Sequence, residues 1–510
     1  MKYTMILSNY STNSVGSSVH CVQMAKIRDL PEEVLLLIFS FLKLRDRKIV
    51  ARVSRLWNRL AFSDRPMRSI SLHAVDYLNA KERKILLKSS RCYRNLTLEW
   101  TEASSEAFCV QVLDKFGSEL TSLRLSTYVI TLPLLVRFLL KTYKLRELII
   151  EGSLCSEECD MVVPEFGDLR SLELTQRGYE SELRELVPTL FPNLTSLDVV
   201  GAENASLDLI RFYSKQLKCL YVLLEGSQLQ KFSELENFEN LQQLNVHWPQ
   251  IIDPKYSVAC FQQMKNVKSA SISGPVNEDT LLSISKWSQL THLCINVQLM
   301  KASTFKSVAN IKNLKSLKLQ GSVREKCFLK DVRLLGVRKL ILDGVSTTND
   351  FYDHLASFVP HVTFLKIYDH TFENASLMLI TKSMVNLQTL SLEYCYQVKD
   401  NGFQFLNYLS GLIELRCWSV PISENAFLRF PKCPNLRTFA VGGSGWITNK
   451  SVLDIPKAFP NLTELNVIDC FKVDEDTIYE LRERMRKCAV VKLEKLEPDR
   501  EAEAPWAKSW

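Results

Sequence analysis

The sequence lacks the long apolar and long basic runs that mark several protein classes. It has no uninterrupted apolar run of about 18 residues, the length that spans a bilayer. Residues 1–24 carry Asn, Ser and Thr where a secretory signal needs an apolar stretch. The net charge is +7 over 510 residues, with no long basic run, so nucleic acid is not expected as the main partner. We expect the chain in the cytosol or the nucleus.

Glycine is also scarce, with 16 residues, which leaves little material for phosphate-cradling loops. No Walker loop, G-x-S-x-G elbow or kinase signature occurs. Acidic clusters at 157–158 and 474–476 are interpreted as solvated turns and helix N-terminal charges, not as acid–base pairs. The sequence therefore predicts a non-catalytic protein.

Cysteine is frequent, with 14 residues, but no C-x-x-C pair occurs. Most of the cysteines lie in apolar-periodic segments and are expected to be buried, reduced thiols. Cys155 and Cys159 form the closest pair, and neither His nor a second Cys pair flanks them at zinc-site spacing. No metal and no cofactor are expected.

The stretch from Ile27 to Leu60 has the pattern of two short amphipathic helices. Pro31 suits the first turn of the first helix, and Asp46 is a candidate N-cap of the second. Two such helices cannot bury both apolar faces alone, so they need the following domain or another protein as a partner. The apolar stripes consist of Leu35, Ile38, Phe39 and Leu42, and of Ile49, Val50, Val53, Trp57 and Leu60.

This stretch resembles the F-box. The match comprises a Leu-Pro-Glu start at 30–32 and a Val-Ser-x-x-Trp end at 53–57, with Ile38, Leu42 and Asp46 between them. Arg47 departs from the pattern, because the family usually carries an apolar residue there.

The resemblance implies docking onto a Skp-family adaptor, and through it onto a cullin-RING scaffold. The alternative is a plain helical hairpin packed on its own chain. On the matched positions, the adaptor-binding residues would be Leu30, Pro31, Ile38, Leu42, Val53 and Trp57.

Beyond residue 66 the sequence repeats the frame L-x-x-L-x-L with conservative substitutions. Fifteen copies begin between Leu120 and Leu462 at intervals of 23 to 26 residues, weaker copies begin at Met67 and Tyr93, and a last one is placed at Val490. This period is that of the leucine-rich repeat, in which a short strand is followed by a return helix. About 17 repeats would form a curved α/β solenoid, with parallel strands on the concave side and helices on the convex side.

The frame also predicts which strand residues are buried. The fourth and sixth residues of each copy should point into the core, and the third, fifth and seventh should face outward. Accordingly, Leu317→Asp should be severely destabilising, whereas Ser316→Asp should be nearly silent.

Cys395 and Cys470 occupy the ninth position of their copies. This resembles the cysteine-containing repeat subtype common behind F-boxes, although most other copies lack that cysteine.

The outward positions change character along the array. Early copies carry small polar residues, whereas those from Leu314 onward carry aromatic and basic ones, which are enriched in interfaces. This patch is the candidate site for an acidic or phosphorylated protein segment; the alternative is that a long loop or the tail packs there. The candidate substrate-binding residues are Lys318, Lys339, Phe364, Lys366, Tyr368, Arg416 and Trp418.

The predicted organisation is a flexible leader at 1–25, the F-box and a linker at 26–66, the solenoid at 67–495 and a polar tail at 496–510. The resemblance implies a substrate-recognition subunit of a Skp-cullin-F-box ubiquitin ligase, which positions a bound protein for ubiquitination. A repeat scaffold that acts without ubiquitin ligation remains open. An enzyme would need a convergent polar site.

Overall fold

The computed structural model describes residues 27–493, apart from residues 28–29, 43, 69, 156–163, 176–182, 200–203, 225–227, 250–252, 300–301, 323–331, 347–348, 424–426, 428–429, 432 and 444. The predicted leader and tail lie outside the described residues. The chain divides into two compact units, Met1–Leu194 and Thr195–Trp510. Within the described residues, no helix is both long and apolar enough to cross a membrane.

The first unit begins with a small helical core. Leu35, Phe39, Leu60 and Ala61 are buried in its centre. The Trp57 ring meets the Phe39 ring edge-on, with 5.3 Å between the ring centroids. The helices are α1 (Glu32–Ser40), α2 (Leu44–Val50), α3 (Arg55–Ala61) and α4 (Asp64–Met67).

The second predicted helix is wrong as a single element. Helix α2 already begins at Leu44, so Asp46 lies within its first turn and is not its N-cap. The chain then leaves the helix, and Ser54, in an extended conformation, caps α3 by accepting a hydrogen bond from the Trp57 amide at 3.1 Å. The predicted apolar stripe is therefore divided between two helices, and its members Ile49 and Val53 are exposed.

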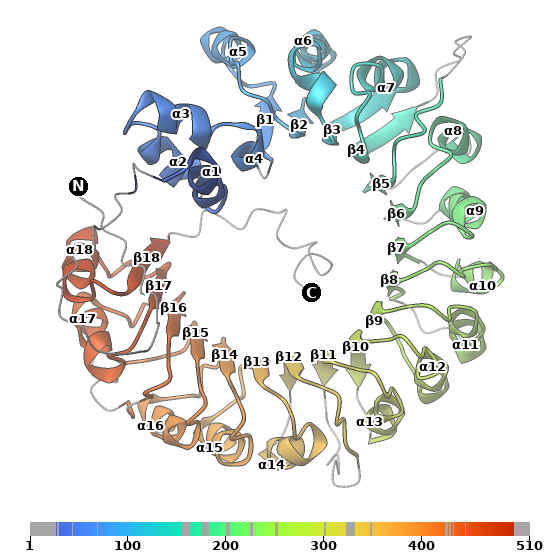
Figure 1. The fold of residues 1–510 in the computed structure, drawn as a ribbon. Coiled ribbons are helices and arrows are strands. Elements are labelled where there is room, and N and C mark those ends of the chain that lie inside the picture. Colours follow the sequence, from blue (N-terminus) through green and yellow to red (C-terminus); the bar gives the residue numbers. More distant parts are fainter. Residues whose placement is uncertain are drawn as a thin grey trace, which may run out of the picture. The chain divides into compact units, whose positions relative to one another are not determined.

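Parallel strands follow in the first unit, each paired with the next (Figure 1). The strands are β1 (Ser71–Val75), β2 (Asn95–Glu99), β3 (Ser122–Thr131), β4 (Glu147–Cys155) and β5 (Ser171–Leu174). The helical segments between and after them are α5 (Ala80–Leu87), η2 (Ala103–Ser105), α6 (Glu106–Phe116), η3 (Gly117–Glu119), α7 (Leu132–Leu139) and α8 (Leu183–Leu190).

The second unit continues the same pattern, with strands on its concave side and helices on its convex side (Figure 1). Its strands are β6 (Ser196–Val199), β7 (Cys219–Leu223), β8 (Gln243–His247), β9 (Ser269–Ser273), β10 (His292–Leu299), β11 (Ser316–Ser322), β12 (Lys339–Ser346), β13 (Phe364–Tyr368), β14 (Thr389–Glu393), β15 (Glu414–Trp418), β16 (Thr438–Gly442), β17 (Glu464–Ile468) and β18 (Ala489–Leu493). Its helical segments are α9 (Asn204–Tyr213), α10 (Gln228–Ser233), α11 (Pro254–Gln262), α12 (Glu278–Ile284), α13 (Ala302–Ala309), α14 (Asn349–Phe358), α15 (Asn374–Ser383), α16 (Asp400–Phe403), η5 (Gln404–Tyr408), α17 (Asn449–Ala458) and α18 (Glu475–Arg484).

These elements confirm the predicted fold class, a short all-helical segment followed by a solenoid of parallel strands and return helices. The strand register pairs equivalent positions of successive repeats, for example Leu340 with Leu365. The fourth and sixth positions are buried, as in β13, where Leu365 and Ile367 are both fully inaccessible. Stacking these apolar side chains from repeat to repeat makes a continuous core within each unit.

Two weak copies are misplaced in the sequence frame. Ser71 pairs with Asn95, so the first copy begins two residues later than Met67. Ala489 pairs with Glu464, which makes Val490 the fourth residue of the last copy and not its first. Both copies have few leucines, so the apolar pattern alone did not fix their register.

Asparagine side chains help to hold successive repeats together. An asparagine directly before the frame start donates from its side-chain amide to a backbone carbonyl of the preceding repeat, at 2.6 to 3.1 Å. Each such bond satisfies a loop carbonyl that has no partner in the strand ladder. These residues are Asn193, Asn240, Asn266, Asn313, Asn435 and Asn461.

Candidate functional site

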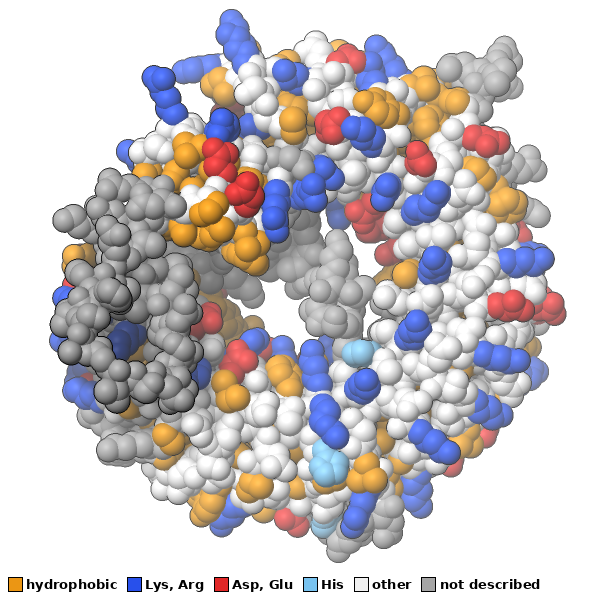
Figure 2. All heavy atoms as spheres, in the orientation of Figure 1, with side chains coloured by type: hydrophobic (Ala, Val, Ile, Leu, Met, Phe, Trp, Pro, Cys, Tyr) orange, Lys and Arg blue, Asp and Glu red, His pale blue; other side chains and the backbone are white. Residues whose placement is uncertain are grey.

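The helical segment of the first unit carries an unusually exposed set of large apolar side chains. Phe41 is 80% exposed and Val53 is 63% exposed. Hydrophobic side chains gather on this part of the surface in Figure 2. We use the name exposed apolar face for Val34, Leu37, Phe41, Leu44, Ile49, Val53 and Leu56.

The predicted adaptor-binding residues fall into two groups. Val53 and Pro31 are exposed, and Pro31 directly precedes α1, where its carbonyl accepts the first helical hydrogen bonds. The others are partly buried and pack against the segment's own core. These are Leu30, Ile38, Leu42 and Trp57.

The sequence reasoning missed Phe41, the most exposed apolar side chain of this segment. It follows the last helical residue, Ser40, and lies outside the predicted stripe. The sequence did contain a signal for it. A helix with one buried stripe has polar residues on its other faces, whereas apolar residues lie on several faces of this helix.

Arg47, the departure from the F-box pattern, is almost completely buried, at 2% exposure. Its guanidinium donates to the backbone carbonyls of Leu42, at 2.7 Å from Nε, and Ser40, at 3.2 Å from Nη2. A third hydrogen bond runs from Nη1 to the carbonyl of Pro66 in α4. Burial lowers the pKa of Arg47 from its ordinary value.

This arrangement gives Arg47 a structural role. The carbonyls of Ser40 and Leu42 lie at the carboxyl end of α1, where helix carbonyls have no intrahelical partner and where a positive charge is favourable. Arg47 therefore joins the end of α1 to α4, a task that an apolar side chain cannot perform.

Residues 27–73 match the F-box-like family model. This F-box-like domain contains both the exposed apolar face and the Arg47 contacts.

Two solved structures are similar to the chain at low identity. One is from the crystal structure of the Rad7 and Elc1 complex in yeast, with 13% identity over 88% of this chain and 90% of that chain and a TM-score of 0.32. The other is from the crystal structure of the TLR13–ssRNA13 complex, with 12% identity over 79% of this chain and 67% of that chain and a TM-score of 0.39.

The predicted substrate-binding residues lie on consecutive strands of the second unit, β11 to β15. We call them the concave patch. Most of them are half-buried, Arg416 is exposed, and Lys318 is buried at 7% exposure. Its members are Lys318, Lys339, Phe364, Lys366, Tyr368, Arg416 and Trp418.

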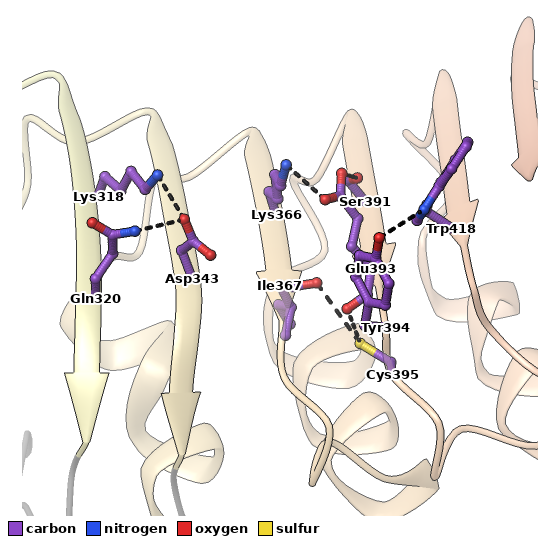
Figure 3. Close-up of polar contacts among 10 residues, drawn as sticks. All are labelled: Lys318, Gln320, Asp343, Lys366, Ile367, Ser391, Glu393, Tyr394, Cys395 and Trp418. Carbon is purple, nitrogen blue, oxygen red and sulfur yellow. Dashed lines mark hydrogen bonds and ion pairs between the residues drawn. The ribbon is translucent and has the colours of Figure 1, made fainter. Parts of the chain in front are cut away.

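Three of the four cations in the concave patch face carboxylates. Lys318 Nζ lies 2.6 Å from Asp343, which also accepts a hydrogen bond from the Gln320 amide at 2.9 Å (Figure 3). Lys366 Nζ lies 2.8 Å from Glu393 (Figure 3).

Arg416 makes the third of these contacts, 2.7 Å from Glu414 of the same strand. The fourth cation, Lys339, lies over the Phe364 ring at 5.1 Å from its centroid. Burial lowers the pKa of Lys339, and the nearby charges of Lys366 and Arg416 lower it further. The patch is therefore less basic than the sequence predicted.

The contacts between neighbouring repeats follow a diagonal rule. A basic fifth residue meets an acidic seventh residue of the next copy in Lys318–Asp343 and Lys366–Glu393, and again in Arg124–Glu151 of the first unit. The sequence contained this signal. It is visible only when successive copies are aligned, because the two partners of each ion pair belong to different copies.

Aromatic rings continue from the patch past the ends of β13 to β15. The Tyr368 and Tyr394 ring centroids are 4.8 Å apart, and His370 stacks on Tyr396 at 5.2 Å. Trp418 Nε1 donates to the Tyr394 hydroxyl at 3.3 Å (Figure 3). Tyr394 itself has a φ of 55°, which is rare for a bulky residue and requires support from its surroundings.

Ser316 shows where the exposure prediction is wrong. Its outward side chain is only 3% exposed, and its hydroxyl has no hydrogen-bond partner within the described residues. On either side, the register places His292 and Lys339, both longer side chains. A carboxylate at this position would be buried, so Ser316→Asp is not a silent control.

Cys395 and Cys470, the two ninth-position cysteines, are both buried. The Cys395 sulfur lies 3.7 Å from the carbonyl oxygen of Ile367 in the preceding repeat (Figure 3), and burial raises the thiol's pKa to about 12. Such a thiol is inert at neutral pH. Within the described ranges, no group of three or more His, Cys, Asp or Glu residues is placed to hold a metal.

The acidic cluster at 474–476 performs the role that the sequence indicated. Asp474 caps α18 by accepting a hydrogen bond from the Thr477 amide at 2.7 Å. This bond lowers the pKa of Asp474. The other cluster, at 157–158, lies outside the described residues.

A hollow of about 540 Å³ opens on the concave side over β14 to β17. It lies at the edge of the concave patch and shares Arg416 and Trp418 with it. The sequence analysis did not find it. Its floor is formed by β16, and the available signal was that the outward residues of this strand that line the hollow, Thr438 and Ala440, are both small.

Proposed function

We propose that this chain is the substrate-recognition subunit of a Skp-cullin-F-box ubiquitin ligase. The F-box-like domain binds a Skp-family adaptor, and the concave patch of the repeat solenoid binds the protein to be ubiquitinated. The observation that carries the proposal is the exposed apolar face on the domain that matches the F-box-like model. A surface of this kind is typical of protein–protein interfaces.

The proposed mechanism is positioning. The chain itself performs no bond-making step; it holds a substrate near the conjugating enzyme on the cullin scaffold and so raises the substrate's effective concentration there. The proposal includes that the protein acts in the cytosol or the nucleus, together with that machinery.

The adaptor contact is proposed to centre on Phe41 and Val53. Both are well exposed and neither belongs to the buried core of the domain, so replacing them should disturb binding more than folding. Trp57 and Leu30 are less suitable probes, because both pack on that core.

The test is a pull-down of a purified Skp-family adaptor by the full chain. Phe41→Asp combined with Val53→Asp should lower adaptor binding at least 100-fold, since large apolar anchors at an interface centre contribute about 2 kcal/mol or more each. Ile85→Asp on α5, where the wild-type side chain is 62% exposed, is the matched control and should bind normally. Wild-type adaptor binding by the double variant would refute the proposal and favour a repeat scaffold without ligase function.

A further inference from the structure

The hollow over β14 to β17 combines apolar walls with carboxylates. Three rows of outward residues cross β15, β16 and β17 in register. In each row the β16 residue is the smallest, and the surface is recessed over Thr438 and Ala440, whereas the Trp418 indole covers Gly442. The rows are Glu414–Thr438–Glu464, Arg416–Ala440–Asn466 and Trp418–Gly442–Ile468.

One end of the hollow is apolar and firmly built. A Cβ atom placed on Gly442 would lie 2.5 Å from Cζ3 of Trp418 and 2.6 Å from the carbonyl oxygen of Ile468. The indole therefore lies directly on the Gly442 backbone, and its Nε1 is held by the Tyr394 hydroxyl. Trp418 and Ile468 both line the hollow, so its apolar end is a wall against which an inserted side chain can lie.

The other end is acidic. Glu414 is already engaged by Arg416. Glu464 is exposed, and within the described part of the chain its carboxylate accepts a hydrogen bond from the neutral Asn466 amide at 2.7 Å. Glu393, which also lines the hollow, pairs with Lys366. The hollow thus presents Glu464, a carboxylate with a neutral donor, at the end opposite to Trp418.

We propose that this hollow receives an arginine side chain of a partner protein. The guanidinium binds Glu464, with its fork of donors matching the two carboxylate oxygens, and the aliphatic stem lies against Trp418 and Ile468. The inference deepens the proposed function, because it gives the chemistry of the protein segment that the solenoid binds, a basic one at this end of the concave patch.

Fluorescein-labelled nonapeptide pools test this directly on the full chain. The pools are random except for a fixed central residue, which is Arg, Lys, citrulline or Glu, and binding is measured by fluorescence anisotropy. Citrulline has the shape of arginine without its charge. The Arg pool should bind at least tenfold more tightly than the citrulline pool, and the Glu pool should bind more weakly than either.

Two variants locate the effect. Glu464→Gln removes the charge at an exposed position, and Ala440→Leu fills the floor without changing charge. Each should reduce the preference for arginine at least threefold. Glu147→Gln, at the equivalent outward position of β4, is the control and should leave it unchanged. Thermal unfolding of each variant shows that the fold is intact.

The proposal is overturned if the Arg and citrulline pools bind equally, if Glu464→Gln retains the full preference, or if the Glu pool binds best. The last outcome would instead support an acidic segment as the bound partner, as predicted from the sequence. None of these outcomes concerns adaptor binding, so this inference and the proposed function can fail separately.

Discussion

Arg47 offers the sharpest test of how the F-box-like domain is held together. Replacing it with alanine removes the donors of three backbone carbonyls, those of Ser40, Leu42 and Pro66. A hydrogen bond to a charged group contributes about 1.5–3 kcal/mol, and a buried acceptor left without a donor costs about 1–3 kcal/mol. Because two of these carbonyls are only part-buried, water can recover some of the loss, and we expect a net cost of about 3 kcal/mol.

Hydrogen exchange monitored by mass spectrometry measures this locally. The amides of Leu42 and Met67, bonded to the carbonyls of Phe39 and Ser63, report on the end of α1 and on α4. A loss of about 3 kcal/mol should accelerate their exchange about 100-fold, since each 1.4 kcal/mol is a factor of ten. The strands of the second unit should exchange as in the wild type.

Three further variants make the test specific. Arg47→Leu installs the kind of residue that F-boxes usually carry at this position, and it should be destabilised nearly as much, because the carbonyls remain without donors. Arg47→Lys should recover only part of the loss, since a single ammonium cannot reach all three acceptors. Arg52→Ala, at an exposed position nearby, is the control. If Arg47→Leu exchanged as slowly as the wild type, the structural role of the guanidinium would be disproved.

Two other predictions concern the second unit. Leu244→Asp, at a position with 2% exposure, should cost more than about 3 kcal/mol of unfolding free energy. Gln243→Asp, at the exposed position beside it, should cost under about 0.5 kcal/mol. Equal shifts in thermal unfolding for the two variants would mean that the repeat register is wrong. Burial lowers the pKa of His247 and of His292 below their ordinary value of 6.5. Above about pH 6.5 both histidines are neutral in the folded and the unfolded chain, so they leave stability unchanged. As the pH falls below that value the unfolded chain binds more protons than the folded one, so stability decreases. The double variant His247→Gln/His292→Gln should lose less unfolding free energy than the wild type between pH 7 and pH 5, and parallel curves for the two proteins would contradict this.

The solenoid was predictable because its signal is periodic. Inward leucines recur every 23 to 26 residues. Within each copy the two inward residues, the fourth and the sixth, are two places apart, so one frame gives the register of most strands. It failed at the first and last copies, where the apolar positions are too few to choose among neighbouring registers.

The sites were less predictable, because they depend on neighbours from other repeats. The frame places Ser316 and Lys318 outward, yet longer or oppositely charged side chains on adjacent strands bury both. The hollow likewise arises because the outward side chains of β16 are smaller than those of the neighbouring strands β15 and β17. In the F-box-like domain, helical periodicity identified the core, but it could not show that Ser54 would start a new helix.

The proposed function requires that this chain couples a bound protein to ubiquitination through its F-box-like domain. The direct measurement is ubiquitin attachment to the proteins captured by the chain in cells with the proteasome blocked, quantified for the wild type and for Phe41→Asp/Val53→Asp. We predict that the double variant captures the same proteins but that their ubiquitination falls at least several-fold. Equal ubiquitination of the proteins captured by both forms would contradict the proposed function.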